Sequence, residues 1–181
     1  GYLGNSDKKW NEWGNYTGDV HMWPYKQNAP SASSYNIVLM HGGKAFSPEN
    51  IELCKVNRSL ENNRVVLHNG ATLCTEANTA GSGFRIGHLE TEVGSTLSGY
   101  MKNSRSAYYM LGFMNTDATL AGTIAPSGYR DDTQLGIIKE GTGTLTITGN
   151  DNYLSGAVRV MEGRVLLMND RAAAESGKLR G

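Results

Sequence analysis

The chain has 181 residues, enough for one domain with a sizeable core, and its 17 Lys and Arg are balanced by 17 Asp and Glu. A formal net charge of zero argues against a nucleic-acid-binding or anionic-membrane surface, because such surfaces carry an excess of positive charge. The 23 Gly and only 4 Pro, set among short β-branched runs and without an apolar run of about 18 residues, are typical of an all-β chain with no membrane-spanning helix.

The N-terminal segment is rich in aromatic residues. Residues 1–34 contain all three tryptophans, and the first convincing strand follows at 35–40, YNIVLM. We expect residues 1–34 to form an irregular cap or first coil, because a chain of stacked repeats must cover its open end. The same rings also suit contact with a glycan, since exposed aromatic faces stack on sugars. The candidate glycan-contact residues are Trp10, Trp13, Tyr16, Trp23 and Tyr25.

The next segment supports two interpretations. SPEN at 47–50 can begin a helix, with Ser47 as the N-cap and Pro48 at the first helical position. IELC at 51–54 instead matches ATLC at 71–74, which favours a strand at 51–56. We adopt the strand as the prediction.

Two series of short strands recur along the rest of the chain. Four stretches carry a Thr-Leu pair after a small residue: 69–75, 93–99, 116–122 and 141–149. Flanking stretches extend this series to six leucines at intervals of 20 to 25 residues: Leu53, Leu73, Leu97, Leu120, Leu145 and Leu166. A second, weaker series lies between them: 84–87, 109–112, 134–139 and 157–160. Each repeat therefore contains at least two short strands.

A repeat of this length fits one turn of a parallel β-helix. In that fold each coil stacks on the previous one at about 4.8 Å, and equivalent strands pair in parallel and in register. A propeller blade needs about 40 residues, and a helical repeat does not fit the period-2 alternation. We predict about five or six coils, with Leu145 and Ile147 pointing inward and Thr144 and Thr146 pointing outward.

Residues 137–170 carry a denser motif. A lysine is followed by Gly-Thr-Gly-Thr-Leu-Thr, then by Asn and Tyr, a strand of alternating valines, and a final glycine and leucine. This segment resembles the autotransporter-associated β-strand repeat, apart from Leu154 and Ser155, where the family more often has Thr-Gly. The matching residues are Lys139, Gly141, Thr142, Gly143, Thr144, Leu145, Thr146, Gly149, Asn150, Asn152, Tyr153, Gly156, Val158, Val160, Gly163 and Leu166.

The resemblance implies a right-handed, single-stranded parallel β-helix from the passenger region of a secreted or surface-displayed bacterial protein. It also implies an extracellular or outer-surface location, a stalk or adhesin-like role, and no catalytic residues. We therefore expect an all-β solenoid with an aromatic-rich cap at 1–34 and coils at 35–181. AAAESGKL at 172–179 looks like the opening of another unit, so we expect the chain to continue beyond residue 181.

The two cysteines, Cys54 and Cys74, each follow a leucine of the repeat series. If the 20 residues between them make one coil, the two Cα atoms lie about 4.8 Å apart, within the range of a disulfide. A disulfide between coils and a stacked pair of free thiols both remain open. A metal site is not expected here, because the further ligands are missing.

Histidines and acids form no catalytic or metal-binding pattern. His68 and His88 are also 20 residues apart and could stack on an exterior edge, although we expect ordinary surface histidines. The adjacent acids Asp131 and Asp132 lie beside Arg130 in a turn at 127–134. We expect solvated charges there rather than an ion site or the carboxylate pair of a glycoside hydrolase, whose members lie about 5–10 Å apart.

These observations predict a non-enzymatic structural or adhesive module, a rigid stalk that displays loops. Its expected partners are glycans or host-surface components and the rest of its own longer chain, with no nucleic acid, metal or cofactor. Two alternatives remain open. One is a glycan-binding module that uses the aromatic cluster, and the other is a polysaccharide-cleaving β-helix whose catalytic coil lies elsewhere or in the 127–134 loop.

Overall fold

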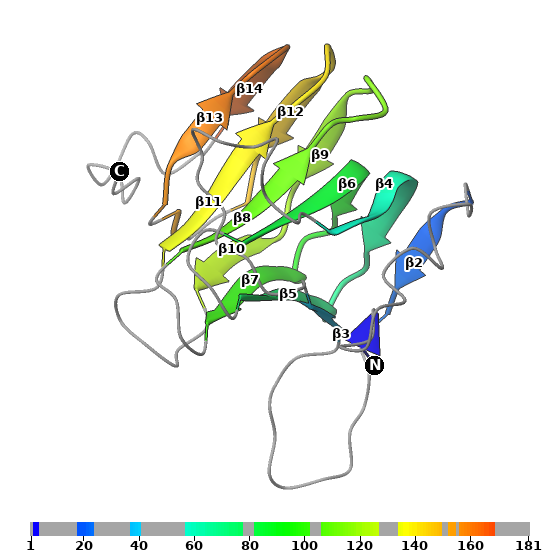
Figure 1. The fold of residues 1–181 in the computed structure, drawn as a ribbon, viewed down its shortest axis with the longest axis vertical. Coiled ribbons are helices and arrows are strands. Elements are labelled where there is room, and N and C mark those ends of the chain that lie inside the picture. Colours follow the sequence, from blue (N-terminus) through cyan, green and yellow to red (C-terminus); the bar gives the residue numbers. More distant parts are fainter. Residues whose placement is uncertain are drawn as a thin grey trace, which may run out of the picture.

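The protein is an all-β chain built from parallel strands (Figure 1). A computed structural model describes residues 2–3, 18–23, 37–40, 57–77, 82–101, 106–126, 134–149, 152–154 and 156–168. Within these ranges the chain forms fourteen strands and no helix, and every strand pairing is parallel. The predictions of an all-β fold and of parallel pairing are therefore confirmed. No helix in the described part of the chain is long and apolar enough to cross a membrane.

One sheet contains five strands and forms one wall of the molecule (Figure 1). In hydrogen-bonded order they are β1 (Tyr2–Leu3), β3 (Ile37–Met40), β5 (Thr72–Ala77), β7 (Thr96–Met101) and β10 (Thr123–Pro126). Spatial order follows sequence order, so β3, β5 and β7 each lie between an earlier and a later strand of the chain. Strand β1 belongs to residues 1–34, so this segment contributes a strand to the sheet.

The second sheet contains nine strands and divides into two rows. It begins with three strands side by side: β2 (Val20–Met22), β4 (Asn57–Leu67) and β6 (Ser82–Thr91). The first half of β6 pairs with β8, and Thr91 at its end pairs with Leu120 of β9. One row continues through β8 (Ser106–Leu111), β11 (Gln134–Lys139) and β13 (Val158–Val160). The other row continues through β9 (Ala118–Leu120), β12 (Thr144–Ile147) and β14 (Arg164–Leu167).

The two sheets enclose one apolar core. Tyr109 in β8 connects them, because its ring is fully buried and its single hydroxyl hydrogen is shared between two main-chain carbonyls of the opposite sheet. The acceptors are the oxygens of Ser98 in β7, at 2.7 Å, and Leu73 in β5, at 3.2 Å. Tyr108 and Met110 flank Tyr109 in β8 and point to the other face of the sheet. They form a second, smaller buried cluster with Ile138.

Strand β12 shows the alternation that the sequence predicts. Leu145 and Ile147 are buried in the core, whereas Thr144 and Thr146 are half-buried on the opposite side. The inward direction predicted for Leu145 and Ile147 is confirmed. A single strand of this kind needs an apolar partner surface, and the core between the two sheets provides it.

The weaker of the two repeat series proves to be a continuous row. Phe84 of β6 pairs with Tyr109 of β8, Tyr109 pairs with Ile137 of β11, and Ile137 pairs with Val158 of β13. All four positions lie on the core side of the strands, because the first three belong to the main core and the fourth is in register with them. The predicted equivalence of the stretches at 84–87, 109–112, 134–139 and 157–160 is therefore confirmed.

The Thr-Leu series is correct only in part. Leu73 pairs with Leu97 as predicted, but Leu97 then pairs with Ile124 of β10 rather than with Leu120. Leu120 lies instead in β9, which belongs to the other sheet. The two strands are easily confused because an outward Thr followed by an inward Leu suits a strand of either sheet.

The later members of that series are displaced by one or two residues. Leu145 pairs with Ala118 and Val165, where the leucine spacing predicted Leu120 and Leu166. At the start of the series, Leu73 lies between Ile37 and Leu97, so the predicted stacking of Leu53 on Leu73 in the sheet is also wrong. Residues 41–56, which include Leu53 and the predicted strand at 51–56, lie outside the described ranges.

Glycines around β12 stand where consecutive parts of the chain touch. A Cβ atom added to Gly143 would lie 2.2 Å from the carbonyl oxygen of Thr116, and one added to Gly149 would lie 2.0 Å from that of Gly122. Both distances are far inside van der Waals contact, so only glycine fits. Gly141 opens the turn before β12 with a φ of 66°, a left-handed conformation that glycine adopts without a Cβ penalty.

Candidate functional site

A polar and aromatic surface lies on the outer side of β2, β4 and β6. In β4, Val65 and Leu67 point into the core, so the alternating residues Arg64 and Val66 point outward. Strand register places Arg64 beside His88, and Val66 between His21 and Glu90. We call this surface the N-terminal polar face. Its residues are Asp19, His21, Trp23, Arg64, His68, His88, Glu90 and Glu92.

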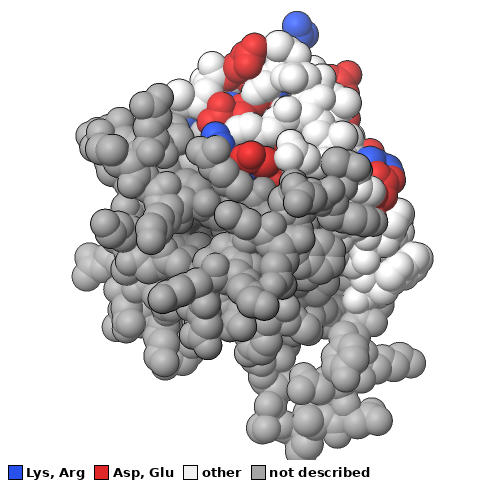
Figure 2. Space-filling view, turned by 45° about the vertical axis from the view of Figure 1, so that its right-hand side comes forward, with Lys and Arg blue, Asp and Glu red and all other residues white. Residues whose placement is uncertain are grey.

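One half of this face is an ion-pair chain that crosses three strands. Arg64 binds Asp19 through one guanidinium nitrogen at 2.9 Å and Glu90 through the other. The other oxygen of Glu90 lies 3.0 Å from His88 Nε2, and His88 Nδ1 lies 2.7 Å from the hydroxyl of Thr116. Burial alone would raise the pKa of Glu90, but contacts with His88 and Arg64 outweigh it and hold this pKa below its ordinary value. On the described surface in Figure 2, acidic and basic side chains accordingly lie next to one another.

The other half is a flat aromatic platform. The ring of Trp23 lies parallel to that of His68, with centroids 3.6 Å apart and planes 11° apart. His21 Nδ1 and His68 Nε2 are 2.9 Å apart, and the two imidazole planes differ by only 14°. The backbone explains this proximity, because the N–H of His68 donates to the carbonyl of Met22 and so holds the end of β4 against the end of β2.

Glu92, the residue that follows β6, fixes the platform from the neighbouring segment. One carboxylate oxygen lies 2.8 Å from His68 Nδ1, and the other accepts the backbone N–H of Asn69 at 2.9 Å. The hydrogen bond from Asn69, followed by the contact with His68, lowers the pKa of Glu92, so the carboxylate is charged at neutral pH. The two contacts hold the His68 ring with Nδ1 toward Glu92 and Nε2 toward His21.

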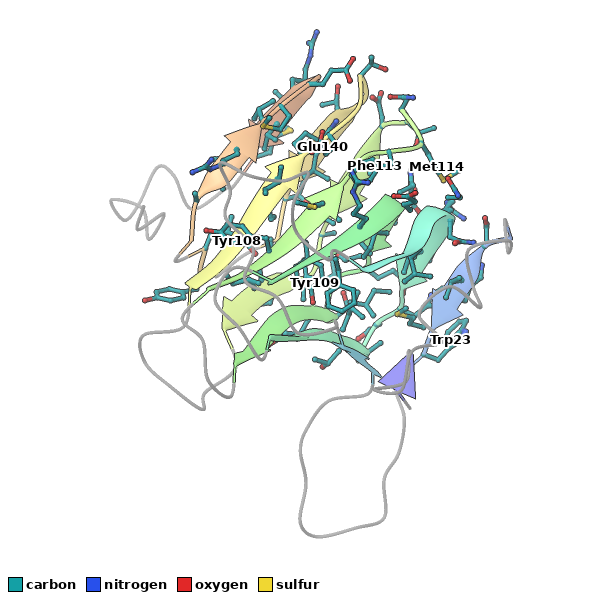
Figure 3. The ribbon with its side chains drawn as sticks, viewed as in Figure 1. Trp23, Tyr108, Tyr109, Phe113, Met114 and Glu140 are labelled. Carbon is teal, nitrogen blue, oxygen red and sulfur yellow. The ribbon has the colours of Figure 1, made fainter. Side chains whose placement is uncertain are left out.

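Trp23 remains open to solvent even though one face of its ring is covered. Its side chain is 64% exposed, and Figure 3 shows it at the edge of the molecule beside β2. A tryptophan that is rigidly stacked and still accessible presents a fixed apolar surface with a polar rim. Tryptophan is enriched at recognition surfaces, where one part of the ring is apolar and its rim is polar.

A buried lysine marks a second charged site, at the turn between β11 and β12. Lys139 is almost fully buried, and its ammonium donates hydrogen bonds to the carbonyls of Glu140 and Gly141, the latter at 2.6 Å. Burial lowers the pKa of Lys139 below its ordinary value. The side chain therefore ties the turn that the Gly-Thr-Gly motif forms, which is a structural task.

Only one of the predicted glycan-contact residues lies in the described part of the chain. Trp23 belongs to the platform, whereas Trp10, Trp13, Tyr16 and Tyr25 fall outside the described ranges. The turn with Asp131 and Asp132 also falls outside them. Its predicted role as a solvated loop, and the alternatives, therefore stay predictions.

The strand pairing does not support the spacing on which a disulfide between Cys54 and Cys74 was predicted. In the sheet, Cys74 lies between Val38 of β3 and Ser98 of β7, so Cys54 is not its neighbour in the row. The earlier neighbour of β5 in this sheet is β3, so the pairing seen here does not follow the 20-residue spacing of the two cysteines. Cys54 itself lies outside the described ranges, so a disulfide between the two is untested.

Two of the described histidines differ from the prediction, whereas His21 is exposed as expected. His68 and His88 do not stack, because register places His88 beside Arg64, and His88 is buried rather than exposed. His41 lies outside the described ranges. Among the described residues, no group of three His, Cys, Asp or Glu side chains is arranged to hold a metal ion.

Sequence reasoning missed most of the N-terminal polar face. Arg64 and Glu90 lie in strands and Glu92 directly follows β6. The neighbours of these strands come from segments of different length, so no fixed spacing links the three residues to Asp19 or His21. A signal was nevertheless present. Outward positions in β4 and β6 alternate with core valines and leucines, and they carry charged residues of opposite sign.

The sequence was compared with protein-family models and with curated proteins. No protein-family model matches the sequence, and no curated protein matches it.

Proposed function

We propose that this chain is a structural and adhesive module of a secreted or surface-displayed bacterial protein, folded as a right-handed, single-stranded parallel β-helix. Its task is to hold a rigid, protease-resistant rod and to present side chains on the outer face of that rod. It acts without catalysing a reaction. The resemblance of residues 137–170 to the autotransporter-associated β-strand repeat supports this proposal together with the strand pairing.

One observation carries the proposal. Segments far apart in the sequence pair in parallel, and the row Phe84, Tyr109, Ile137 and Val158 keeps its register across four strands. A chain that pairs each segment with the next equivalent one extends along a single axis, and each repeat is stabilised mainly by its neighbours. Such a chain suits a stalk better than a compact enzyme.

The charged groups of the N-terminal polar face also favour a structural role. Arg64 engages Glu90, and Glu92 is held by His68 and a backbone N–H. Carboxylates whose pKa values are lowered by such contacts are poor general acids at neutral pH, because they are already deprotonated.

Stacking of coils can be tested by cross-linking. Thr119 of β9 is in register with Thr146 of β12, so cysteines at these two positions should have Cα atoms about 4.8 Å apart and should form a disulfide under mild oxidation. The control pair, Thr119→Cys with Thr144→Cys, follows the leucine spacing instead and should not link. Mass spectrometry identifies the linked peptides with the native cysteines in place.

The functional part is tested on the same chain. We expect no turnover in a screen of polysaccharides for hydrolase and lyase products, and slow cleavage of the described strands by proteases. An antibody against the chain should label intact cells that express the natural protein. Sugar release by the purified chain, or labelling only after the cells are permeabilised, would refute the proposal.

A further inference from the structure

We propose that the N-terminal polar face binds a neutral pyranose sugar, with one sugar ring stacked on the exposed face of Trp23. This inference rests on the proposed adhesive role and names the chemistry of the contact. It requires a supported aromatic ring, hydrogen-bonding groups at its rim, and a local charge that suits an uncharged ligand. Each of these is present among the described residues.

The supported ring is Trp23. The apolar C–H face of a pyranose packs on an indole ring, and this contact is strongest when the ring loses little freedom on binding. His68 holds one face of Trp23 at a centroid distance of 3.6 Å, and the side chain is still 64% exposed. The platform is therefore already ordered before any ligand arrives.

The polar residues around Trp23 are also held in place by contacts with one another. His68 is fixed by Glu92 on one side, at 2.8 Å, and by His21 on the other, at 2.9 Å. The carboxylate of Glu92 is about half-exposed, so its oxygens can also accept hydrogen bonds from sugar hydroxyls. His21 lies two residues before Trp23 and is exposed, so it is a further candidate for a hydrogen bond to the same ligand.

The charges of the face favour a neutral sugar over an acidic one. Among its described residues, three carboxylates, those of Asp19, Glu90 and Glu92, face a single guanidinium, that of Arg64. Arg64 is already engaged by two of these carboxylates, so it is poorly placed to pair with a ligand anion. Sialylated or sulfated glycans would meet net negative charge, whereas neutral hexoses would not.

The dimensions suit a short oligosaccharide. Asp19, His21 and Trp23 alternate along one strand direction, which spans roughly 13 Å from the first to the third. The three strands β2, β4 and β6 add roughly 10 Å in the perpendicular direction. A ligand stacked on Trp23 can therefore extend toward Asp19 and Arg64 and contact the ion-pair chain.

The test uses the complete chain and defined sugars. Binding of cellobiose, maltose and lactose, with sialyllactose as the acidic counterpart, is measured by calorimetry and by tryptophan fluorescence. We expect at least one neutral disaccharide to bind and sialyllactose to bind at least about tenfold more weakly than lactose. Trp23→Ala should weaken binding at least about tenfold, and Trp23→Phe should retain part of it.

Two further variants separate the contact from effects on folding. Tyr153→Ala removes a partly exposed aromatic ring outside the N-terminal polar face and should leave binding unchanged. His68→Ala removes the support beneath Trp23 and should weaken binding while the circular dichroism of the strands stays that of the wild type. Equal binding by wild type and Trp23→Ala, or no binding of any neutral sugar by the wild type, would overturn the inference.

These outcomes are distinct from a failure of the proposed function. A chain that passes the cross-linking test, shows no turnover and binds none of the sugars refutes only the sugar site. A chain that cleaves one of the sugars refutes the non-enzymatic function, whichever variant reduces the cleavage.

Discussion

Strands β11 and β13 lie side by side in the same row, yet the same core position is buried in one and open in the other. Ile137 of β11 pairs with Val158 of β13, and their exposed fractions are 0% and 38%. The neighbouring row repeats the contrast, since Ile147 of β12 is buried and its partner Leu167 of β14 is half-exposed. Residue type and alternation are alike in each pair, so neither explains the difference.

The difference teaches that burial in this fold depends on neighbours from other segments of the chain. Ile137 has β8 on one side and β13 on the other, whereas β13 has a described neighbour only in β11. An inward-facing side chain in such a row is covered by the strands on either side of its own as much as by the opposite sheet. The middle of each row should therefore be more stable than the last described strands, β13 and β14.

The largest expected effect comes from removing a side chain in the middle of the row. Ile137→Ala deletes buried methyl and methylene groups and leaves a cavity, so we expect the free energy of unfolding to fall by about 2–5 kcal/mol. Urea denaturation followed by circular dichroism measures the change. A loss as small as that expected for Val158→Ala in β13 would show that the middle of the row is not better packed than its end.

A smaller effect is expected at the end of the same row. Val158→Ala removes a side chain that is already partly in water, so the free energy of unfolding should fall by less than about 1 kcal/mol. The same denaturation experiment applies, and the two variants serve as controls for each other. A loss of several kcal/mol would mean that Val158 is covered in solution by a further segment.

The smallest effect on stability is expected from the charge of Glu140, which lies beside the covered strand β11. Burial raises the pKa of Glu140, at the end of β11, despite the opposing influence of Arg85. A raised pKa means that ionised Glu140 destabilises the folded state, so its favourable contribution is present below pH 4.5 and is lost as pH rises through the folded-state pKa. Glu140→Gln should therefore raise the midpoint of thermal unfolding slightly at pH 7, and the gain should vanish below about pH 4.5.

A matched control exists at the open end. Glu162 is exposed on the turn that follows β13, so Glu162→Gln removes no buried charge and should raise the midpoint of thermal unfolding at pH 7 by less than Glu140→Gln does. A stabilisation by Glu162→Gln as large as that by Glu140→Gln would contradict the assignment of the effect to burial.

Much of the repeating architecture could be predicted from the sequence, and most of the candidate site could not. The stretches around Phe84, Tyr109, Ile137 and Val158 were predicted as equivalent because each has core residues at alternate positions before a turn. The Thr-Leu pairs failed after Leu97 because strands of both sheets share that pattern. Trp23 was recognised as a possible contact residue, but His68 and Glu92 were not, since the chain between them and Trp23 has no regular period.

The sequence by itself determined that this chain is all-β, that its short strands alternate apolar and polar side chains, and where glycine must stand at the turns. These are local properties, because alternation and turn conformation depend only on neighbouring residues. The tertiary structure decided which strands pair, which end of each row is covered, and that Trp23, His68 and Glu92 meet on one face. Those outcomes depend on contacts between segments of unequal length, and a local pattern cannot encode the length of the chain that separates two partners.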